Sequence, residues 1–498
     1  MGLKAALSLP YAKYIVRKNQ KWINHPLESQ QKVFKHLIEQ GRKTKFGKDH
    51  EFDKIHSVKE FKEKVPVRDY EALKTYFDAV RKGENNILWP GKPIYLSKTS
   101  GTTSGAKYIP ITKESIPYHI KAARDSILQY ILRTGSTGFV NGKMIFLQGS
   151  PQLDYSEAIP TGRLSGIVAH HVPAYLQRNR MPSFNANCIE DWEEKVDAIC
   201  QETLKQPMHL ISGIPPWVQM YFEKLIEMSG KETIKDIFPN FELFIYGGVN
   251  YAPYRQSMEK LMGRSVDSIE LYPASEGFIA YQDKKEEDGL LLLVNGGLYY
   301  EFIPAEDYGK ENAHRLSLEE VELNKNYALV LSSNAGLWSY DIGDTVKFVS
   351  LNPFRIKVSG RIKHYTSAFG EHVIAEEVEQ AIAYINAKFS LDIKEFHLAP
   401  KIQINEELPY HEWLIEFNSL PENIDLIGKA LNEKMCSLNP YYNDLIEGKV
   451  LQNLKIKTVQ RGAFSKYMKS EGKLGGQNKL PRLANDRKIA DHQAFVED

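Results

Sequence analysis

Apolar residues recur at helical spacing through the first ninety residues of the chain. A periodic stretch opens at Pro26, a residue that suits the first turn of a helix. Its apolar face consists of residues whose spacing matches a helix: Val33, Phe34, Leu37 and Ile38. Two further helices are predicted near Val58–Lys64 and Tyr70–Tyr76. We therefore expect residues 1–90 to be largely helical.

Beyond residue 91 the pattern changes to short apolar runs separated by Gly, Pro and Ser. These runs predict buried strands at Ile94–Leu96, Lys143–Leu147, Phe241–Tyr246 and Ser268–Leu271. Longer periodic segments between them predict helices at Ile116–Leu132, Cys188–Lys205 and Pro216–Met228. Alternation of strands and helices is typical of an α/β architecture.

The last third of the chain divides into two regions of different texture. Residues 289–348 are rich in apolar strand-like runs, which predict a small antiparallel sheet or barrel that includes a buried strand at Leu290–Val294. Turn residues punctuate the chain near 350–361, so we place a domain boundary there. A helix at Ala375–Lys388 and a strand at Glu412–Phe417 follow. We expect domains at 1–355 and 356–498, the second a small α+β domain.

Composition narrows the class of protein. The 498 residues are enough for more than one domain, and 42% hydrophobic with 26% charged residues is ordinary for a globular protein. The 64 basic and 63 acidic residues give a formal net charge of +1, so we expect neither nucleic acid nor a membrane as partner. Three cysteines without metal-ligand spacing (Cys188, Cys200 and Cys436) favour a reducing compartment, the cytoplasm.

Residues 97–107 carry the strongest chemical signal. The run Ser-Lys-Thr-Ser-Gly-Thr-Thr-Ser-Gly-Ala-Lys is mostly hydroxylic residues and glycine. We expect a loop that brings backbone N–H groups and hydroxyls close to a phosphate, with Lys107 adding a positive charge. The spacing of Gly101, Gly105 and Lys107 does not match a Walker loop. A polar surface loop is the alternative reading.

Two strand ends add groups that a nucleotide needs. Gly247 and Gly248 follow the run Phe244–Tyr246 and would let a flat ligand lie against bare backbone, although a simple turn has the same sequence. Tyr272 and Glu276 lie four residues apart after another strand. The tyrosine could cover a base and the carboxylate could hold Mg²⁺, while a solvated loop acid is the alternative.

Two later segments complete the set. Asp344 lies between a turn glycine and a strand, where a carboxylate can accept hydrogen bonds from a ribose diol or simply close a β-turn. Lys479 lies in the glycine-rich, basic segment 472–482, which by default would be a solvated tail. Taken together, these segments offer groups that could bind the phosphates, the base, a metal ion and the ribose of a nucleotide. They predict an ATP site, with a second domain that could close over it.

These motifs resemble those of the adenylate-forming superfamily, which includes acyl-CoA synthetases and firefly luciferase. Thr99–Lys107 is similar to its phosphate loop, Tyr272–Glu276 to Y-x-x-[ST]-E, and Tyr340–Asp344 to Y-R-x-G-D. Within the superfamily, the chain resembles the auxin-responsive acyl-acid amido synthetases of the Gretchen Hagen type. The segments that carry this likeness read TKFG (44–47), VPVRDY (65–70), GENNILW (83–89), IPPW (214–217) and QNKLPR (477–482).

The resemblance implies a large N-terminal adenylate-forming domain, with mixed sheets, helices and a small barrel-like subdomain, and a mobile C-terminal domain hinged at about 352–363. It implies ATP and Mg²⁺ as cofactors, with Glu276 as metal ligand and Glu276 and Lys479 as catalytic residues. Implied phosphate-binding residues are Thr99, Ser100, Gly101, Thr102, Thr103, Ser104 and Lys107. Implied adenine-side residues are Gly247, Gly248 and Tyr272, and implied ribose-side residues are Asp344 and Arg361. Pro273, Ala274 and Ser275 are further implied ATP-binding residues.

The implied reaction joins a small carboxylic acid to an amino acid through an acyl-adenylate. An acyl-CoA ligase is the alternative enzyme, and an adenylate-binding protein without turnover is the non-enzymatic one. Two departures put the substrates in doubt, because Asp341 stands where the family often has arginine and Asn478 where plant members have tyrosine. Trp217, Tyr221 and Phe222 suggest an apolar acyl pocket or, equally, core. We expect a monomer or a weak homo-oligomer.

Overall fold

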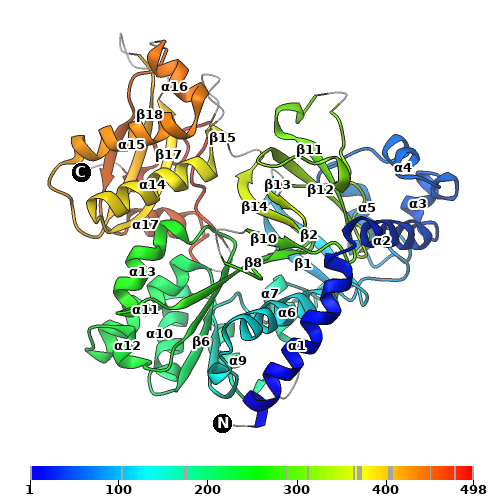
Figure 1. Cartoon of the computed structure of the whole chain (residues 1–498), viewed down its shortest axis with the longest axis horizontal. Helices are drawn as coiled ribbons and strands as arrows, with labels where there is room; N and C mark the ends of the chain where they lie inside the picture. Colours follow the sequence, from blue (N-terminus) through cyan, green and yellow to red (C-terminus); the bar gives the residue numbers. More distant parts are fainter. Residues whose placement is uncertain are drawn as a thin grey trace. The chain divides into compact units, whose positions relative to one another are not determined.

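The computed structural model describes residues 3–102, 105–172, 177–285, 289–310, 313–362, 365–366, 373–401, 408–448, 450–475 and 478–495. By their mutual contacts the residues form two compact units (Figure 1). The first unit comprises Met1–Lys231, Lys235–Gly248 and Val266–Lys357, and the second Glu232–Ile234, Val249–Ser265 and Val358–Asp498. The boundary predicted between residues 355 and 356, with its hinge, stays a prediction.

Helices dominate the first ninety residues, as the apolar spacing predicts. They are α1 (Leu3–Ile23), α2 (Pro26–Gly41), α3 (Lys45–Asp49), α4 (Val58–Lys64) and α5 (Lys74–Arg81). Ser57 caps α4 in a reciprocal box with Glu60, which fixes the start of the helix where the sequence predicts it. The helix predicted at Tyr70–Tyr76 was placed too early, since α5 begins at Lys74.

An 11-stranded sheet forms the centre of the first unit. Its parallel part has the order β5 (Arg180–Met181), β3 (Lys143–Phe146), β6 (Met208–Ser212), β7 (Leu243–Gly247) and β8 (Asp267–Ala274). The order then continues through β9 (Gly277–Tyr281), β10 (Leu290–Leu292), β14 (Phe354–Arg361), β13 (Tyr340–Leu351), β12 (Asn326–Ser333) and β11 (Leu298–Pro304). The strand-rich segment predicted at 289–348 thus pairs antiparallel and extends the same hydrogen-bonded sheet.

Helices connect the parallel strands. They include α6 (Ile116–Thr134), α7 (Leu164–Ala169), α9 (Phe184–Cys188), α10 (Trp192–Thr203) and α11 (Pro215–Ser229). The single helix predicted at Cys188–Lys205 is wrong at its start. Asp191 accepts a hydrogen bond from the Glu194 amide at 2.9 Å and caps α10, so the chain breaks between α9 and α10.

Aromatic packing holds the N-terminal helices against the antiparallel strands. Trp338 is almost fully buried, with its ring centre 6.0 Å from that of Phe46 and 4.8 Å from that of Phe52. Its indole N–H donates to the Leu88 carbonyl at 3.0 Å, so the one polar atom of this side chain is satisfied.

The segment predicted as a phosphate loop is largely a β-hairpin. Strands β1 (Tyr95–Thr102) and β2 (Gly105–Ile111) pair antiparallel, with Thr99 opposite Lys107, and β4 (Thr161–Gly162) pairs parallel with β1. The loop prediction was wrong for most of 97–107. Antiparallel backbone pairing orders the segment, and the buried Leu96, Ile109 and Ile111 anchor both strands.

The second unit is a small α+β body. Its sheet has the order β17 (Ile393–Lys401), β18 (Tyr410–Phe417) and β19 (Lys455–Val459), with β18–β19 parallel. Helices α14 (Ala375–Phe389) and α15 (Ile424–Leu438) share its core, and α16 (Pro440–Glu447) and α17 (Ala463–Ser470) follow along the chain. The short 3-10 turn Ala252–Tyr254 and α13 (Arg255–Met262), which lie between β7 and β8 in sequence, also group with this unit.

The described helices do not include one that is both long enough and apolar enough to cross a bilayer.

Candidate active site

A pair of serine hydroxyls joins two of the predicted motifs. The Oγ atoms of Ser97, in β1, and Ser275, just beyond β8, lie 2.9 Å apart. Ser97 is fully buried, so its hydroxyl is fixed by this partner rather than by water. The hairpin and the Tyr272–Glu276 segment therefore meet in space.

Tyr340 lies between a cation and a carboxylate. The Lys107 Nζ atom lies 5.9 Å from the centre of the Tyr340 ring, close enough for a weak cation–π attraction. Burial raises the pKa of Tyr340 well above its usual value, and the charge of Glu276 adds to that effect. The predicted phosphate-side lysine thus lies near the Tyr340 ring, and the charge of the predicted metal ligand acts on the Tyr340 hydroxyl.

The predicted base-side tyrosine contacts the predicted ribose-side acid. The Tyr272 hydroxyl donates to Asp344 Oδ2 at 2.7 Å, and Tyr272 is buried. A charge-assisted bond of this kind fixes both side chains. Asp344 is therefore an oriented hydrogen-bond acceptor in β13. Tyr272 has a second role besides the predicted cover of a base, because its hydroxyl holds Asp344 in place.

The two glycines at the end of β7 have structural reasons of their own. A Cβ atom on Gly247 would lie 2.4 Å from the Leu271 carbonyl oxygen in the neighbouring strand β8. Gly248 has φ +83°, a backbone conformation that favours glycine. Close strand pairing and a left-handed turn explain both residues, and contact with a base stays a prediction.

Asp341, which stands where the family often has arginine, is an internal acceptor. Its Oδ2 atom accepts from the Tyr308 hydroxyl at 2.5 Å, and its Oδ1 atom accepts from the Gly343 amide at 2.8 Å. The side chain is buried. These two hydrogen bonds give the acid at this position a role in the fold.

The predicted acyl-pocket residues are core. Trp217, Tyr221 and Phe222 are all buried in α11, and the Tyr221 hydroxyl lies 2.7 Å from the Thr203 hydroxyl. Trp217 packs on Trp192, with ring centres 5.0 Å apart. These contacts favour the packing alternative for Tyr221 and Phe222.

Lys479 lies beside an anchored segment of the second unit, not in a solvated tail. Lys479 itself is exposed, but the next residue, Leu480, is buried. The Leu398 amide of β17 donates to the Arg482 carbonyl at 2.9 Å, and the Ala484 amide donates to the Leu398 carbonyl at 3.0 Å. The default reading of segment 472–482 is therefore wrong for residues 480–482, because strand-like pairing fixes them.

A buried guanidinium organises this part of the second unit. Arg482 contacts the Glu395 carboxylate and the Tyr254 hydroxyl, and its Nε atom lies 3.9 Å from Glu379 Oε1. Burial raises the pKa of Glu379 to about 7, and the positive charge of Lys479 partly opposes that shift. Lys479 and Glu379 are thus electrostatically coupled.

Several predicted site residues are incompletely described. Thr103 and Ser104 lie outside the described residues. For Ser100, Gly101, Thr102 and Arg361 the structure gives the backbone, which is in β1 or β14. Pro273 and Ala274 lie in β8 and pair with Phe278 and Gly277.

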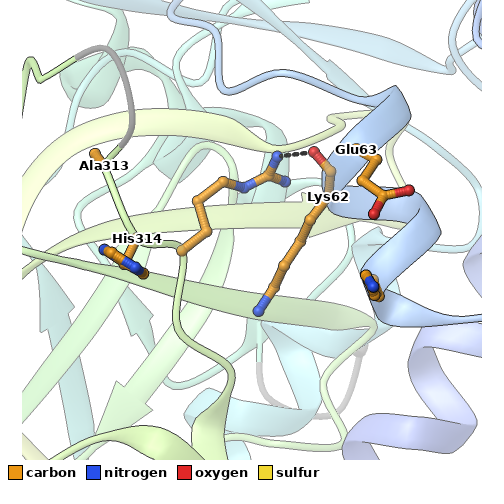
Figure 2. A pocket seen from close by; sticks show the side chains of 6 residues that line it. Lys62, Glu63, Ala313 and His314 are labelled. Atoms are coloured by element: carbon orange, nitrogen blue, oxygen red, sulfur yellow. Dashed lines mark hydrogen bonds between the residues drawn. The ribbon is translucent and has the colours of Figure 1, made fainter.

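A surface hollow lies elsewhere on the first unit. It has a volume of about 430 Å³ and is lined by Lys59, Lys62, Glu63, Ala313, His314 and Arg315. Figure 2 shows it between helix α4, which carries Lys62 and Glu63, and the segment of Ala313 and His314. Arg315 is an ion-pair partner of the buried Glu301 at 2.7 Å, so its charge is already compensated. None of the predicted site residues lines this hollow.

Comparison of the sequence with known protein families shows the family to which this chain belongs. Three domain profiles match in order: the GH3 family N-terminal domain at residues 16–184, the central domain at 291–361 and the C-terminal domain at 376–488. The chain belongs to the GH3 family.

Curated GH3 relatives match over most of their length. The Arabidopsis thaliana protein named indole-3-acetic acid-amido synthetase GH3.4 is 24% identical over 93% of this chain and 90% of its own. The Nicotiana attenuata protein named jasmonoyl–L-amino acid synthetase JAR4 is 24% identical over 58% of this chain and 60% of its own.

Solved structures match the fold. The structure of AtGH3.15 acyl acid amido synthetase in complex with 2,4-DB has a TM-score of 0.79 at 16% identity, covering 96% of this chain and 95% of that one. A 2-hydroxyisobutyryl-CoA ligase in its postadenylation state has a TM-score of 0.60 at 12% identity, covering 93% of this chain and 89% of that one. The predicted α/β fold class and the resemblance to the GH3 family are confirmed.

The sequence analysis gave no role to three residues that lie near predicted ones: Tyr340 near Lys107 in the first unit, and Glu379 and Arg482 near the Lys479 segment in the second. Tyr340 stands at the head of a motif that the sequence analysis used only for Asp344. Glu379 and Arg482 gave no signal as a pair, because 102 intervening residues hide their contact. The Q-x-K-x-P-R pattern at 477–482 was the available hint for Arg482.

Proposed function

We propose that this GH3 chain is an ATP-dependent ligase that joins a small carboxylic acid to an amino acid through an acyl-adenylate. Membership of the family, with three domains in order, carries the proposal. The printed activities of the relatives, indole-3-acetic acid-amido and jasmonoyl-amino acid synthetases, support amide formation as the reaction class. The meeting of Ser97, Lys107 and Glu276 around one region supports a phosphate site.

In the first half-reaction, a carboxylate oxygen attacks the α-phosphorus of ATP. The bond from that phosphorus to the bridging oxygen breaks, and pyrophosphate leaves. Two anions must approach one another, so positive groups and oriented donors are needed at the phosphates. Lys107 and the hairpin amides are proposed to supply them, with Thr99, Ser100, Gly101, Thr102, Thr103 and Ser104 on the phosphate side.

Glu276 is the residue proposed to hold Mg²⁺. Among the residues that the structure describes, no group of three or more His, Cys, Asp or Glu side chains is arranged to bind a metal. A half-buried single carboxylate fits the way proteins hold Mg²⁺ together with substrate phosphates. When bound, the cation would offset the charge that develops on the phosphates. A Mg²⁺ titration of Glu276→Gln that matched the wild-type curve would exclude this ligand.

The nucleoside is proposed to lie along the ends of β7, β8 and β13. Asp344, oriented by Tyr272, would accept from the ribose hydroxyls, with Arg361 beside them. The base side is proposed to comprise Gly247, Gly248, Tyr272, Pro273, Ala274 and Ser275. Lys479 is proposed as the catalytic cation of the second unit.

In the second half-reaction, the amine nitrogen attacks the acyl carbonyl carbon. The carbon–oxygen bond to the phosphate breaks, AMP leaves, and the nitrogen loses a proton to give the amide. Adenylate is a good leaving group, so positioning of the amine and exclusion of water govern this step.

The experiment that tests the function is pyrophosphate release from ATP across aromatic, jasmonate-like and fatty acids, with and without mixed amino acids. Acid-dependent release with amino-acid-stimulated AMP formation is expected. Stimulation by CoA in place of amino acids would support the alternative acyl-CoA ligase. AMP binding without turnover in any combination would support a binding protein.

We further propose a cytoplasmic protein that is monomeric or weakly self-associating and binds neither nucleic acid nor membrane. Cys188, Cys200 and Cys436 are free thiols, which supports a reducing compartment. Analytical ultracentrifugation at several concentrations tests the oligomeric state.

A further inference from the structure

Among the residues that the structure describes, no carboxylate forms an ion pair with Lys195, a buried lysine of the first unit. Lys195, in α10, is 3% exposed, and its Nζ atom donates to the Gln148 carbonyl at 3.1 Å and the Asn187 carbonyl at 2.6 Å. An ammonium has three N–H groups, so one remains for another acceptor. Burial lowers the pKa of Lys195 to about 8; the nearby Cys188 thiol opposes this shift, and the charge of Arg163 adds to it.

Arg163 is a second cation without compensation. Within the described part of the chain, its guanidinium has no acidic partner within 4 Å, and burial lowers its pKa. The acids nearest in sequence to Lys195 are the exposed Glu193 and Glu194 and the half-buried Asp197, whose Oδ1 atom lies 3.3 Å from Lys224 Nζ. Buried cations are normally paired, so the buried Lys195 and the half-buried Arg163, which have no ion-pair partner among the described residues, form a positive region that suits an anion.

Further polar atoms without a partner belong to residues whose carbonyls hold Lys195, Gln148 and Asn187, and to Trp192 at the start of α10. Gln148 Nε2, Trp192 Nε1 and Asn187 Oδ1 are each shielded from solvent and without a hydrogen-bond partner. The first two are donors, and Trp192 and Asn187 are each 4% exposed. Leaving several such groups unmet inside a fold costs free energy that a bound polar ligand would recover.

This cluster connects to the phosphate hairpin. Gly162, the residue before Arg163, pairs with Ser97 in the β1–β4 ladder. The stem of Arg163 crosses the backbone of Gly149, where a Cβ atom would lie 2.5 Å from Arg163 Cδ. Gly149 directly follows Gln148, whose carbonyl holds Lys195. A continuous run of contacts thus leads from Ser97 through Arg163 to Lys195.

We propose that Arg163 and Lys195, with the amide of Gln148 and the indole of Trp192, bind the α-carboxylate of the amino-acid substrate. This inference rests on the proposed function. Both proposed substrates carry a carboxylate. The carboxylate of the acyl acid is converted to the mixed anhydride of the adenylate, so it does not stay an anion. The α-carboxylate of the amino acid survives both half-reactions, so a fixed cationic site suits it. The Asn187 oxygen, an acceptor, suits an amine N–H and finds no counterpart on a hydrocarbon acyl group.

The test compares Arg163→Gln with Arg180→Gln. Arg180, in β5, is a matched control because it too is half-buried but has internal partners, with the Ala169 carbonyl at 3.3 Å and the Phe146 ring at 5.3 Å. Each variant is assayed with the amino acid that best stimulates wild-type AMP formation and with the carboxamide of that amino acid. Acid-dependent pyrophosphate release without amino acid is measured alongside.

Arg163→Gln should raise the KM for the amino acid by about 10- to 100-fold, the usual effect of losing a charged hydrogen bond. It should also remove most of the preference for amino acid over carboxamide, and leave pyrophosphate release within about twofold. Arg163→Lys keeps the positive charge but not the planar guanidinium, so its KM for the amino acid should lie between those of the wild type and Arg163→Gln. Arg180→Gln should keep the wild-type preference.

Other outcomes overturn the assignment in distinct ways. If Arg163→Gln raised the KM for the carboxylic acid and not that for the amino acid, the cluster would bind the acyl substrate. An unchanged preference in a folded Arg163→Gln would mean that the cluster holds water only. If no acid supports pyrophosphate release, the proposed function fails, and calorimetric titration of wild type and Arg163→Gln with L-alanine and L-alaninamide still decides the site. Equal heats for both ligands in both proteins would then overturn it.

Discussion

The hydroxyl of Tyr272 donates to the carboxylate of Asp344 at 2.7 Å, so a residue of β8 orients a residue of β13 that the sequence separates from it by 72 positions. The tyrosine is buried and the acid is half-buried. This bond makes the proposed ribose acceptor a fixed group, which lowers the entropy lost when a nucleotide binds.

Tyr272→Phe removes that bond while keeping the ring. We expect the KM for ATP to rise several-fold and the free energy of unfolding to fall by about 1 kcal/mol, the net worth of one hydrogen bond. Steady-state pyrophosphate release and urea unfolding measure the two effects. Tyr308→Phe, which removes the analogous bond to Asp341, should cost similar stability and leave the KM for ATP unchanged. Equal KM values in all three proteins would remove Asp344 from the nucleotide site.

A comparison of variants at Lys107 and Lys98 distinguishes a specific phosphate contact from the general positive charge of the hairpin. The two lysines lie on paired strands, and only Lys107 lies beside Tyr340, while Lys98 is exposed. Lys107→Met should slow pyrophosphate release by about 10²- to 10³-fold, as loss of one charge-stabilising contact typically does. Lys98→Met should stay near wild type. A matching loss in both variants would point to the general charge of the hairpin.

Lys479→Ala tests the lysine that precedes the anchored segment. Adenylation should slow by about 10²-fold or more while AMP affinity, measured by calorimetry, stays close to wild type. Lys473→Ala, another exposed lysine upstream, serves as the control. Turnover of Lys479→Ala at the wild-type rate would remove this residue from the mechanism.

The sequence predicted the α/β class because helical and strand periodicities are local properties. It failed at the 97–107 hairpin, where hydroxyl and glycine content argued for a loop. Pairing of Thr99 with Lys107 and burial of Leu96 and Ile109 outweighed that local preference. It also misplaced the start of α10, since the cap at Asp191 interrupts an apolar run that looked continuous.

The sequence indicated the individual residues of the candidate site, but it could not predict how they are arranged in space. Motif order indicated Glu276 and Asp344, yet the hydrogen bond of Asp344 with Tyr272 and the effect of the Glu276 charge on Tyr340 depend on strand register across the sheet. The unpaired charge of Arg163 was invisible for the same reason, because no local pattern shows that a cation lacks a partner. Burial and pairing are properties of the folded chain.

Gly247→Ala tests the structural reason for the glycine at the end of β7. The added methyl would meet the Leu271 carbonyl at 2.4 Å, and backbone atoms cannot yield as a side chain can. We expect a loss of about 1–3 kcal/mol in the free energy of unfolding. Gly428→Ala, in α15, where an added Cβ would lie 3.8 Å from Ile456 Cδ1 in ordinary contact, should be neutral or slightly stabilising. A Gly247→Ala protein as stable as wild type would show that strands β7 and β8 tolerate a wider spacing.

Glu379 gives the second unit a stability that depends on pH. Burial raises the pKa of Glu379 from 4.5 to about 7 in the folded chain. Between these values the folded protein binds more protons than the unfolded one, so this group's contribution to stability falls as pH rises and is fully unfavourable above pH 7. Glu379→Gln removes the titration. Relative to wild type, the variant should therefore gain stability between pH 5 and pH 8.5, by up to about 3 kcal/mol. Urea unfolding at both pH values measures the difference. Glu433→Gln, an exposed acid on α15, should show no such change. A pH-independent difference between Glu379→Gln and wild type would mean that the carboxylate stays ionised beside Arg482 throughout this range.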